Sequence, residues 1–271
     1  MDYTVITKEQ ARLIRGFVAD DIYEGFAENN RFAVCATKEN TLCGVGVFDA
    51  KTFMEIVDIV VLPQYTGKLE GKLLNIIMGA FAGLPCEAVK MDVYEGPETE
   101  ALRKALVDNG FKESGKSVLY RFSMEDMYNN PRFGNVTVRE GIHSLFEVSD
   151  GVKKVFSNML IQKGLYSNFL SEDISDTLST VYVQDGRIMG CVLVQIMDEE
   201  SFYVEFVYVD ERAKKHALPA MLRESADAVA AYYQETGADG FILATNKTAV
   251  EMVDKTLPNA YIVDINTTYI N

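Results

Sequence analysis

The sequence is short of histidine and cysteine. Its 271 residues include two histidines, His143 and His216, which lie far apart, so a metal centre or a histidine-based catalytic triad has no support and no metal is expected. The four cysteines lack the spacing of metal or redox motifs, which predicts free thiols in a reducing, cytoplasmic compartment. These cysteines are Cys35, Cys43, Cys86 and Cys191.

Long apolar runs are absent as well. No uninterrupted apolar segment approaches the ~20 residues that a membrane-spanning helix needs. Residues 1–17 contain no basic segment followed by an apolar core, as a secretory signal would. We therefore expect a soluble, unprocessed chain without a membrane partner.

Positive charge is in deficit along the whole chain. The 26 Lys and Arg face 40 Asp and Glu, and the net charge of -14 is spread over both halves. Nucleic acid is not an expected partner, because its phosphates require clustered positive charge. An acidic surface steers cationic small molecules or basic peptides toward a protein; the simpler alternative is that the charge keeps the chain soluble.

The length predicts two α/β domains. The chain is long for one domain, and 48% hydrophobic residues are enough for two cores. The segment 127–135 is rich in Asn, Pro and Gly and lacks periodicity, so it is the best linker candidate. The expected domains are 1–128 and 133–271.

The two halves share one pattern of elements. The first predicts the order β-α-β-β-β-α-β-α-β with a hairpin turn at Glu39-Asn40, and the second contains a hairpin turn at Asp185-Gly186. Aligning Thr66 with Arg212 gives the same offset as aligning Gly71 with Ala217. An internal duplication is the economical explanation.

The segment VLPQYTGKLEGKLL, Val61 to Leu74, predicts a buried strand, a loop and an apolar helix. Such a loop points several backbone N–H groups at one spot, with the positive end of the helix dipole behind them, and this arrangement binds phosphate. A nucleotide-triphosphate loop does not fit, because only three residues separate Gly67 from Gly71 and a leucine follows Lys72. A dinucleotide fingerprint at CGVGVFD fails because Asp49 occupies the place of its third glycine.

The longer sequence FMEIVDIVVLPQYTGKLEGKLL, with NGF at Asn109–Phe111 ending a helix, resembles the acetyl-CoA-binding core of the GNAT superfamily of N-acetyltransferases. The resemblance covers nearly all of residues 1–128. It implies an α/β fold of two tandem GNAT-like (acyl-CoA N-acyltransferase) domains, each a mixed central sheet flanked by helices. It also implies acetyl-CoA as the cofactor.

The resemblance implies which residues contact coenzyme A. In the family, a loop of pattern Gln/Arg-x-x-Gly-x-Gly/Ala binds the pyrophosphate through backbone amides. Here Thr66 replaces the Gln/Arg, Leu69 replaces the first Gly, and Gly71 keeps the second. The backbone of the central strand would bind the acetyl-pantetheine arm. The residues so implied are Ile59, Val60, Val61, Thr66, Gly67, Lys68, Leu69, Glu70, Gly71 and Lys72.

Catalysis by acyl transfer to an amine needs a group that accepts the ammonium proton. Glu55 matches the general-base glutamate of one branch of the family, and its apolar flanks favour a raised pKa. The alternative is that Glu55 is a solvent-facing or salt-bridged residue without a catalytic role. The second candidate for the base is Asp58, which the period-two rule places on the opposite face of the strand. The family's tyrosine acid is absent, since Leu106 stands in its place. Tyr94 is a possible substitute.

The second half matches the same family pattern less well. Arg212 and Ala217 fit the loop, but Lys215 stands where a glycine is expected. Asn246 begins a matching NxxA helix start, yet Val253 occupies the tyrosine position. We expect a degenerate copy that supports the first site.

The resemblance implies acetyl-CoA-dependent N-acetyl transfer to a small amine or basic peptide, directly in a ternary complex. The alternative is a non-catalytic acyl-CoA-binding or scaffold module, which the departures at Leu69 and Leu106 favour. The protein is expected to be a monomer or a homodimer.

Overall fold

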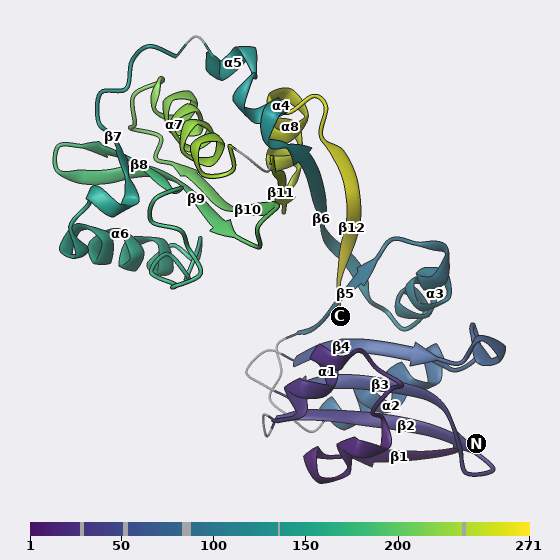
Figure 1. The fold of residues 1–271 in the computed structure, drawn as a ribbon. Helices are drawn as coiled ribbons and strands as arrows, with labels where there is room; N and C mark the ends of the chain where they lie inside the picture. Colours follow the sequence, from purple (N-terminus) through teal and green to yellow (C-terminus); the bar gives the residue numbers. More distant parts are fainter. Residues whose placement is uncertain (28–29, 51–53, 83–87, 135, 235–236) are drawn as a thin grey trace. The chain divides into compact units, whose positions relative to one another are not determined.

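The computed structural model describes the whole chain except residues 28–29, 51–53, 83–87, 135 and 235–236, so the expectation for Cys86 lies outside the described residues. The chain forms two compact α/β units (Figure 1). The first comprises Met1–Ser117 with Asp264–Asn271, and the second comprises Val118–Val263.

The first unit is a mixed sheet with helices packed on it. The strands run in the order β1-β2-β3-β4-β5-β12, and all neighbouring strands are antiparallel except β4 and β5. The elements are β1 Asp2–Ile6, η1 Lys8–Leu13, α1 Asp20–Glu24, η2 Gly25–Ala27, β2 Arg31–Lys38, β3 Thr41–Ala50, β4 Met54–Val61, η3 Pro63–Tyr65, α2 Glu70–Phe81, β5 Val89–Tyr94, η4 Pro97–Thr99, α3 Glu100–Asp108, the start of β6 Lys112–Ser123, and the end of β12 Tyr261–Ile270.

The second unit repeats this plan. Its strands run in the order β6-β11-β10-β9-β8-β7, and β10 and β11 form the parallel pair. The remaining elements are α4 Met124–Tyr128, α5 Pro131–Gly134, β7 Ile142–Ser144, η5 Leu145–Glu147, α6 Asp150–Gln162, β8 Thr180–Gln184, β9 Arg187–Ile196, β10 Ser201–Val209, α7 Ala217–Tyr232, β11 Asp239–Ala244 and α8 Lys247–Thr256.

Each predicted hairpin turn is found. Glu39 and Asn40 have φ of 52° and 64°, and Asp185 and Gly186 have φ of 51° and 72°. Positive φ at both central residues is the requirement of a tight turn whose twist suits the flanking strands.

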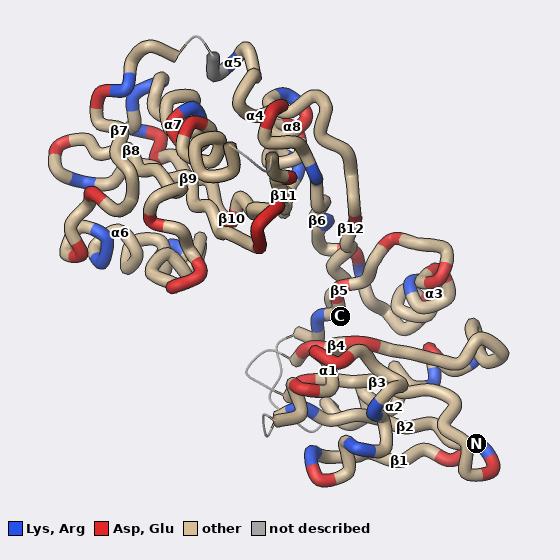
Figure 2. The backbone as a smooth tube through the Cα atoms, in the orientation of Figure 1, with Lys and Arg blue, Asp and Glu red and all other residues tan. Residues whose placement is uncertain are grey.

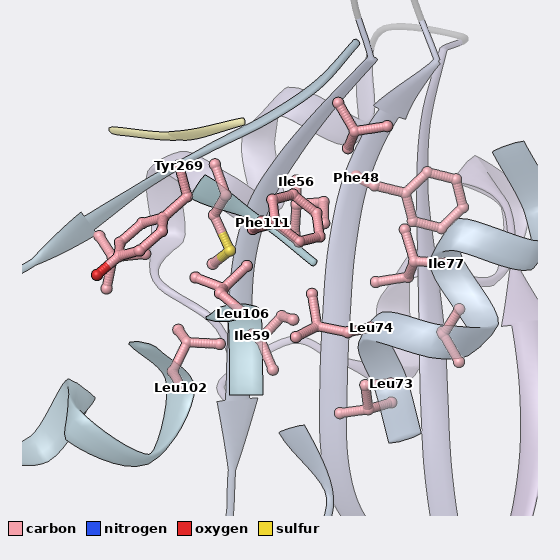
Figure 3. Close-up of a cluster of buried hydrophobic side chains, with 14 of the residues drawn as sticks. Phe48, Ile56, Ile59, Leu73, Leu74, Ile77, Leu102, Leu106, Phe111 and Tyr269 are labelled. Atoms are coloured by element: carbon pink, nitrogen blue, oxygen red, sulfur yellow. The ribbon is translucent and has the colours of Figure 1, made fainter. Parts of the chain in front are cut away.

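One core of the first unit lies between the sheet and helices α2 and α3 (Figure 3). The helical leucines Leu73, Leu74 and Leu106 are fully buried there. Leu106 is therefore a core residue of α3, which explains why no tyrosine stands at this position. Tyr269, from the C-terminal end of β12, packs into the same core.

Two strands exchange between the halves of the chain. The C-terminal end of β12 pairs with β5, from Asn266↔Tyr94 to Ile270↔Lys90. The end of β6 pairs with β11, from Val118↔Ala244 to Ser123↔Asp239. The compact units therefore divide the chain differently from the predicted domains 1–128 and 133–271. Those domain limits remain a prediction from the sequence.

Candidate active site

The parallel strands β4 and β5 part within the first unit. Their described residues pair only at Met54↔Val89 and Glu55↔Lys90. Val57 is an extra residue in β4, because the β3 pairing passes from Phe48↔Ile56 to Val47↔Asp58. The predicted coenzyme-binding residues 59–61 thus lie on the parted part of β4.

The bulge changes which carboxylates share a face of the sheet. Directly paired residues project to the same side, and Glu55 pairs with Asp49 while Asp58 pairs with Val47. Val47 and Asp49 are two positions apart on β3 and project to the same face, so Glu55 and Asp58 lie on one face as well. The period-two expectation of opposite faces is wrong because a bulge adds one residue.

The two carboxylates differ in their surroundings. The Glu55 side chain is 47% exposed, with Oε1 4.0 Å from Lys90 Nζ, which corresponds to the solvent-facing, salt-bridged alternative. Burial raises the pKa of Asp58; the backbone N–H of Ile59 opposes that rise, and the nearby charge of Asp21 adds to it. The environment of Asp58 therefore favours a bound proton.

The loop between β4 and α2 fits leucine at position 69 without strain. Leu69 is the helix N-cap with φ -104° and ψ -27°, which any residue adopts, and it is 2% exposed in the core. Gly67, with φ +77°, is the residue of this loop in the left-handed region. The Leu69 side chain therefore contributes to the core of the first unit.

Most of the loop's amides are already engaged. The Gly67 N–H donates to Glu70 Oε1 at 3.0 Å. The N–H groups of Lys68 and Leu69 donate to the Tyr65 carbonyl at 3.0 and 3.2 Å. Glu70 is 3% exposed, and among the described residues its Oε2 has no hydrogen-bond partner. A carboxylate thus lies inside the predicted phosphate loop.

The second unit has a corresponding opening with a defined cavity. Its parallel strands pair from Ser201↔Asp239 to Val204↔Ile242, and Glu205 is the bulge residue that follows. A cavity of about 360 Å³ lies between β10, β11 and α8. Tyr203 and Glu205 line it from β10 and Asn246 lines it from the start of α8.

A glutamate and two tyrosines provide polar chemistry in this cavity. The Tyr166 hydroxyl donates to Glu205 Oε1 at 3.1 Å, and its ring stacks on Phe206 at 4.5 Å between centroids. Burial, with a smaller contribution from Glu205, raises the pKa of Tyr203 to about 12 and also raises that of Tyr166. Both phenols are therefore neutral near pH 7, and Tyr166 holds the carboxylate in place.

Sequence reasoning missed Glu205. The signal was present, because FYVEFVYV contains one carboxylate within an apolar strand, as FMEIV does around Glu55. Asn246 caps α8, accepting from the Ala249 N–H at 2.9 Å, so the NxxA pattern marks a helix start.

The loop before α7 differs in charge from the loop before α2. Asp210 accepts from the backbone N–H of Arg212 and from its guanidinium at 2.8 and 2.9 Å, and these bonds hold the pKa of Asp210 far below its usual range. Among the described residues, the backbone N–H groups of Lys214, Lys215 and His216 have no hydrogen-bond partner. This loop therefore offers free amides beside cationic side chains.

Comparison with solved structures identifies the fold. A GCN5-related N-acetyltransferase from Sphaerobacter thermophilus superposes with a TM-score of 0.66 at 12% identity, over 99% of this chain and 95% of that one. A tandem GNAT protein from the clavulanic acid biosynthesis pathway gives 0.64 at 10% identity, over 100% and 98%. The GCN5-related glucosamine N-acetyltransferase region of a fungal multidomain GH3 beta-N-acetylglucosaminidase gives 0.70 at 10%, over 99% of this chain and 38% of that one.

The chain has the tandem GNAT fold that the sequence predicts. No protein-family model matches the sequence, and no curated protein matches it significantly. The likeness therefore lies in the arrangement of the elements.

Two further findings concern metals and membranes. In the described part of the chain, no three His, Cys, Asp or Glu side chains gather closely enough to hold a metal ion. None of the described helices is both long and apolar enough to cross a membrane.

Proposed function

We propose that the protein transfers an acetyl group from acetyl-CoA to an amine, directly within a ternary complex. The observation that carries this proposal is the second-unit cavity, where parted parallel strands, a bulge and a held carboxylate occur together. The fold supports acyl-CoA-dependent N-acetyltransfer in general.

The proposed chemistry uses Glu205 as the proton acceptor. An incoming ammonium group must lose a proton before its nitrogen can attack the thioester carbonyl carbon. The carboxylate of Glu205 takes that proton, directly or through water. The nitrogen attacks the carbonyl carbon, the carbon–sulfur bond breaks, and the second proton that the nitrogen gives up goes to the departing thiolate. Tyr166 orients the carboxylate through its 3.1 Å hydrogen bond.

The residues expected from the sequence give a second version of the same proposal. In it, Glu55 is the base, residues 59–61 bind the pantetheine arm, and Thr66–Lys72 hold the pyrophosphate. We favour the second unit, because Glu55 is half-exposed beside Lys90 and the Gly67 amide is bonded to Glu70.

The acceptor is proposed to be a small amine or a basic peptide. Acidic residues outnumber basic ones in both units, and Figure 2 shows them distributed over the chain. Such a field attracts cations. A cytoplasmic location is proposed as well, since the described cysteines, Cys35, Cys43 and Cys191, are buried free thiols.

Two measurements on the whole protein test this function. Calorimetric titration with coenzyme A measures binding, and release of free thiol from acetyl-CoA with a panel of amines measures turnover. We expect both. Binding without turnover on any amine would favour a non-catalytic acyl-CoA-binding module, for which Glu70 within the first loop is the supporting observation. Absence of both would favour a scaffold.

A further inference from the structure

The starts of helices α2 and α7 correspond in the duplicated pattern but carry opposite chemistry. Aligning Gly71 with Ala217 places Glu70 opposite His216. Each helix follows the parted strand of its unit, and each exceeds ten residues. Each helix start therefore has the dipole and the amides of an anion site.

At the start of α2 an anion is already present. Glu70 is 3% exposed, and its Oε1 accepts the Gly67 N–H at 3.0 Å. This bond resembles half of a capping box, in which a glutamate accepts an amide three residues before it. Capping does not explain Oε2, which is buried without a hydrogen-bond partner among the described residues. A buried carboxylate oxygen in that state is unfavourable and marks a special site.

A phosphate and the Glu70 carboxylate would compete for the same backbone N–H donor and the same helix end. Both groups are oxyanions that accept backbone N–H bonds and are stabilised by the positive helix end. A diphosphate placed before α2 would lose the Gly67 amide as a donor and would face a like charge. Lys68 and Lys72 are exposed beside this loop, so cationic side chains are present before both helices, and the difference lies in Glu70.

At the start of α7 no carboxylate takes the amides of residues 214–216. Their N–H groups have no partner among the described residues. Lys214 and Lys215 are exposed beside them, and Lys214 Nζ lies 3.4 Å from Glu140 Oε2. Of the two acidic residues of this loop, Asp210 accepts from the guanidinium of Arg212, and Glu211 is exposed to solvent. The Nε2 atom of His216 is buried without a partner in the described structure.

We infer that the carboxylate of Glu70 occupies the anion site of the first unit and excludes the diphosphate of coenzyme A, which binds the loop before α7 instead. The choice of ligand rests on the proposed function. The exclusion rests on the contact between Glu70 and Gly67. The protein then binds one coenzyme per chain, although the fold is duplicated.

Calorimetric titration of the full chain with coenzyme A tests the inference. The wild type is expected to bind one equivalent, and the double variant Lys214→Glu/Lys215→Glu is expected to bind at least tenfold more weakly. Adding Glu70→Gln or Glu70→Ala to that double variant should restore binding by about tenfold, since each removes the charge. Glu100→Gln, which removes an exposed carboxylate at the start of α3, is the matched control and should restore nothing.

Two results would overturn the inference: unchanged affinity in the double variant, or no gain from either Glu70 substitution. Circular dichroism melting shows that each variant is folded, and Glu70→Gln retains an amide acceptor for Gly67 if Glu70→Ala unfolds. If the wild type binds no coenzyme A, the proposed function fails by itself. In that case, titration with inorganic pyrophosphate tests the exclusion by Glu70 alone. Binding to the triple variant Glu70→Ala/Lys214→Glu/Lys215→Glu, without binding to the double variant, supports the exclusion. Binding to neither variant contradicts it.

Discussion

Glu205 is the residue on which the proposed chemistry depends most. It is the bulge residue of β10, lines the cavity and is held by Tyr166. Removing a proton acceptor typically lowers rate by 10²–10⁴. We expect Glu205→Gln to lower kcat/KM by about 100-fold at neutral pH without weakening coenzyme A binding, as measured by thiol release and calorimetry. The matched Glu55→Gln variant distinguishes a site in the second unit from one in the first. A comparable loss of kcat/KM in Glu55→Gln, with no loss in Glu205→Gln, would place the reaction in the first unit.

Asp58 gives a pH-dependent effect on stability. Burial raises its pKa in the folded protein above the unfolded value near 3.9. The folded state therefore binds the proton more tightly, so the stability contributed by protonated Asp58 is complete below the unfolded pKa. It is lost as pH rises through the folded pKa.

Asp58→Asn keeps the size of the side chain but cannot ionise. We expect it to raise Tm by a few degrees at pH 7 and to leave Tm unchanged near pH 3, where aspartate is protonated in both states. Melting curves over this range measure the difference. A constant difference at both pH values would show that ionisation is not its cause.

At the scale of elements, the joint between β4 and α2 depends on one glycine. Gly67 has φ +77°, and a Cβ added to it would meet nothing within 4 Å. Strain of the left-handed conformation, about 1–2 kcal/mol, is therefore the whole expected effect of Gly67→Ala. Gly79, within α2, also has open space around it, and there alanine should stabilise by about 0.8–1.0 kcal/mol. Urea unfolding measures both; destabilisation by both variants would contradict this reading of the loop.

The elements themselves could be predicted from the sequence, because they depend on local periodicity. The succession of strands in the first half, both hairpin turns and the apolar helix after the 61–70 segment follow from hydrophobic spacing and turn residues. The bulge at Val57 could not, since an extra strand residue is defined only by its partners on β3. The contact between Glu70 and Gly67 could not be predicted for a different reason. A glutamate at a helix start is normally solvated, and the burial of Glu70 depends on how α2 packs.

At the scale of the whole molecule, the exchanged strands link the stability of the first unit to the C-terminus of the chain. Tyr269 is 2% exposed and packs with Leu102 and Leu106, more than 150 positions earlier. Tyr269→Ala should destabilise the first unit by about 3–5 kcal/mol, in the range of other large buried aromatics. Limited proteolysis should then cleave residues 1–117 first. Cleavage confined to 118–263 would contradict the exchange.

The strand exchange could not be predicted from the sequence, because β6 and β12 each fit the pattern of a last strand in their own half of the chain. A duplicated pattern predicts two units, but it does not show that residues 264–271 pair with β5. The loop motif of the second half departs from the family pattern, so the sequence predicts a degenerate copy, and the proposed role of this loop rests on the structure. What counts there is charge and free amides, and these come from residues 214–216 without a second glycine.

A crystal structure of the protein with bound coenzyme A tests the central claim most directly. We expect the diphosphate to lie against the amides of residues 214–216 and the thiol end to lie in the cavity beside Glu205, with Glu70 still bonded to Gly67. A diphosphate held by Thr66–Lys72, with Glu70 displaced and the second-unit cavity without coenzyme, would contradict it.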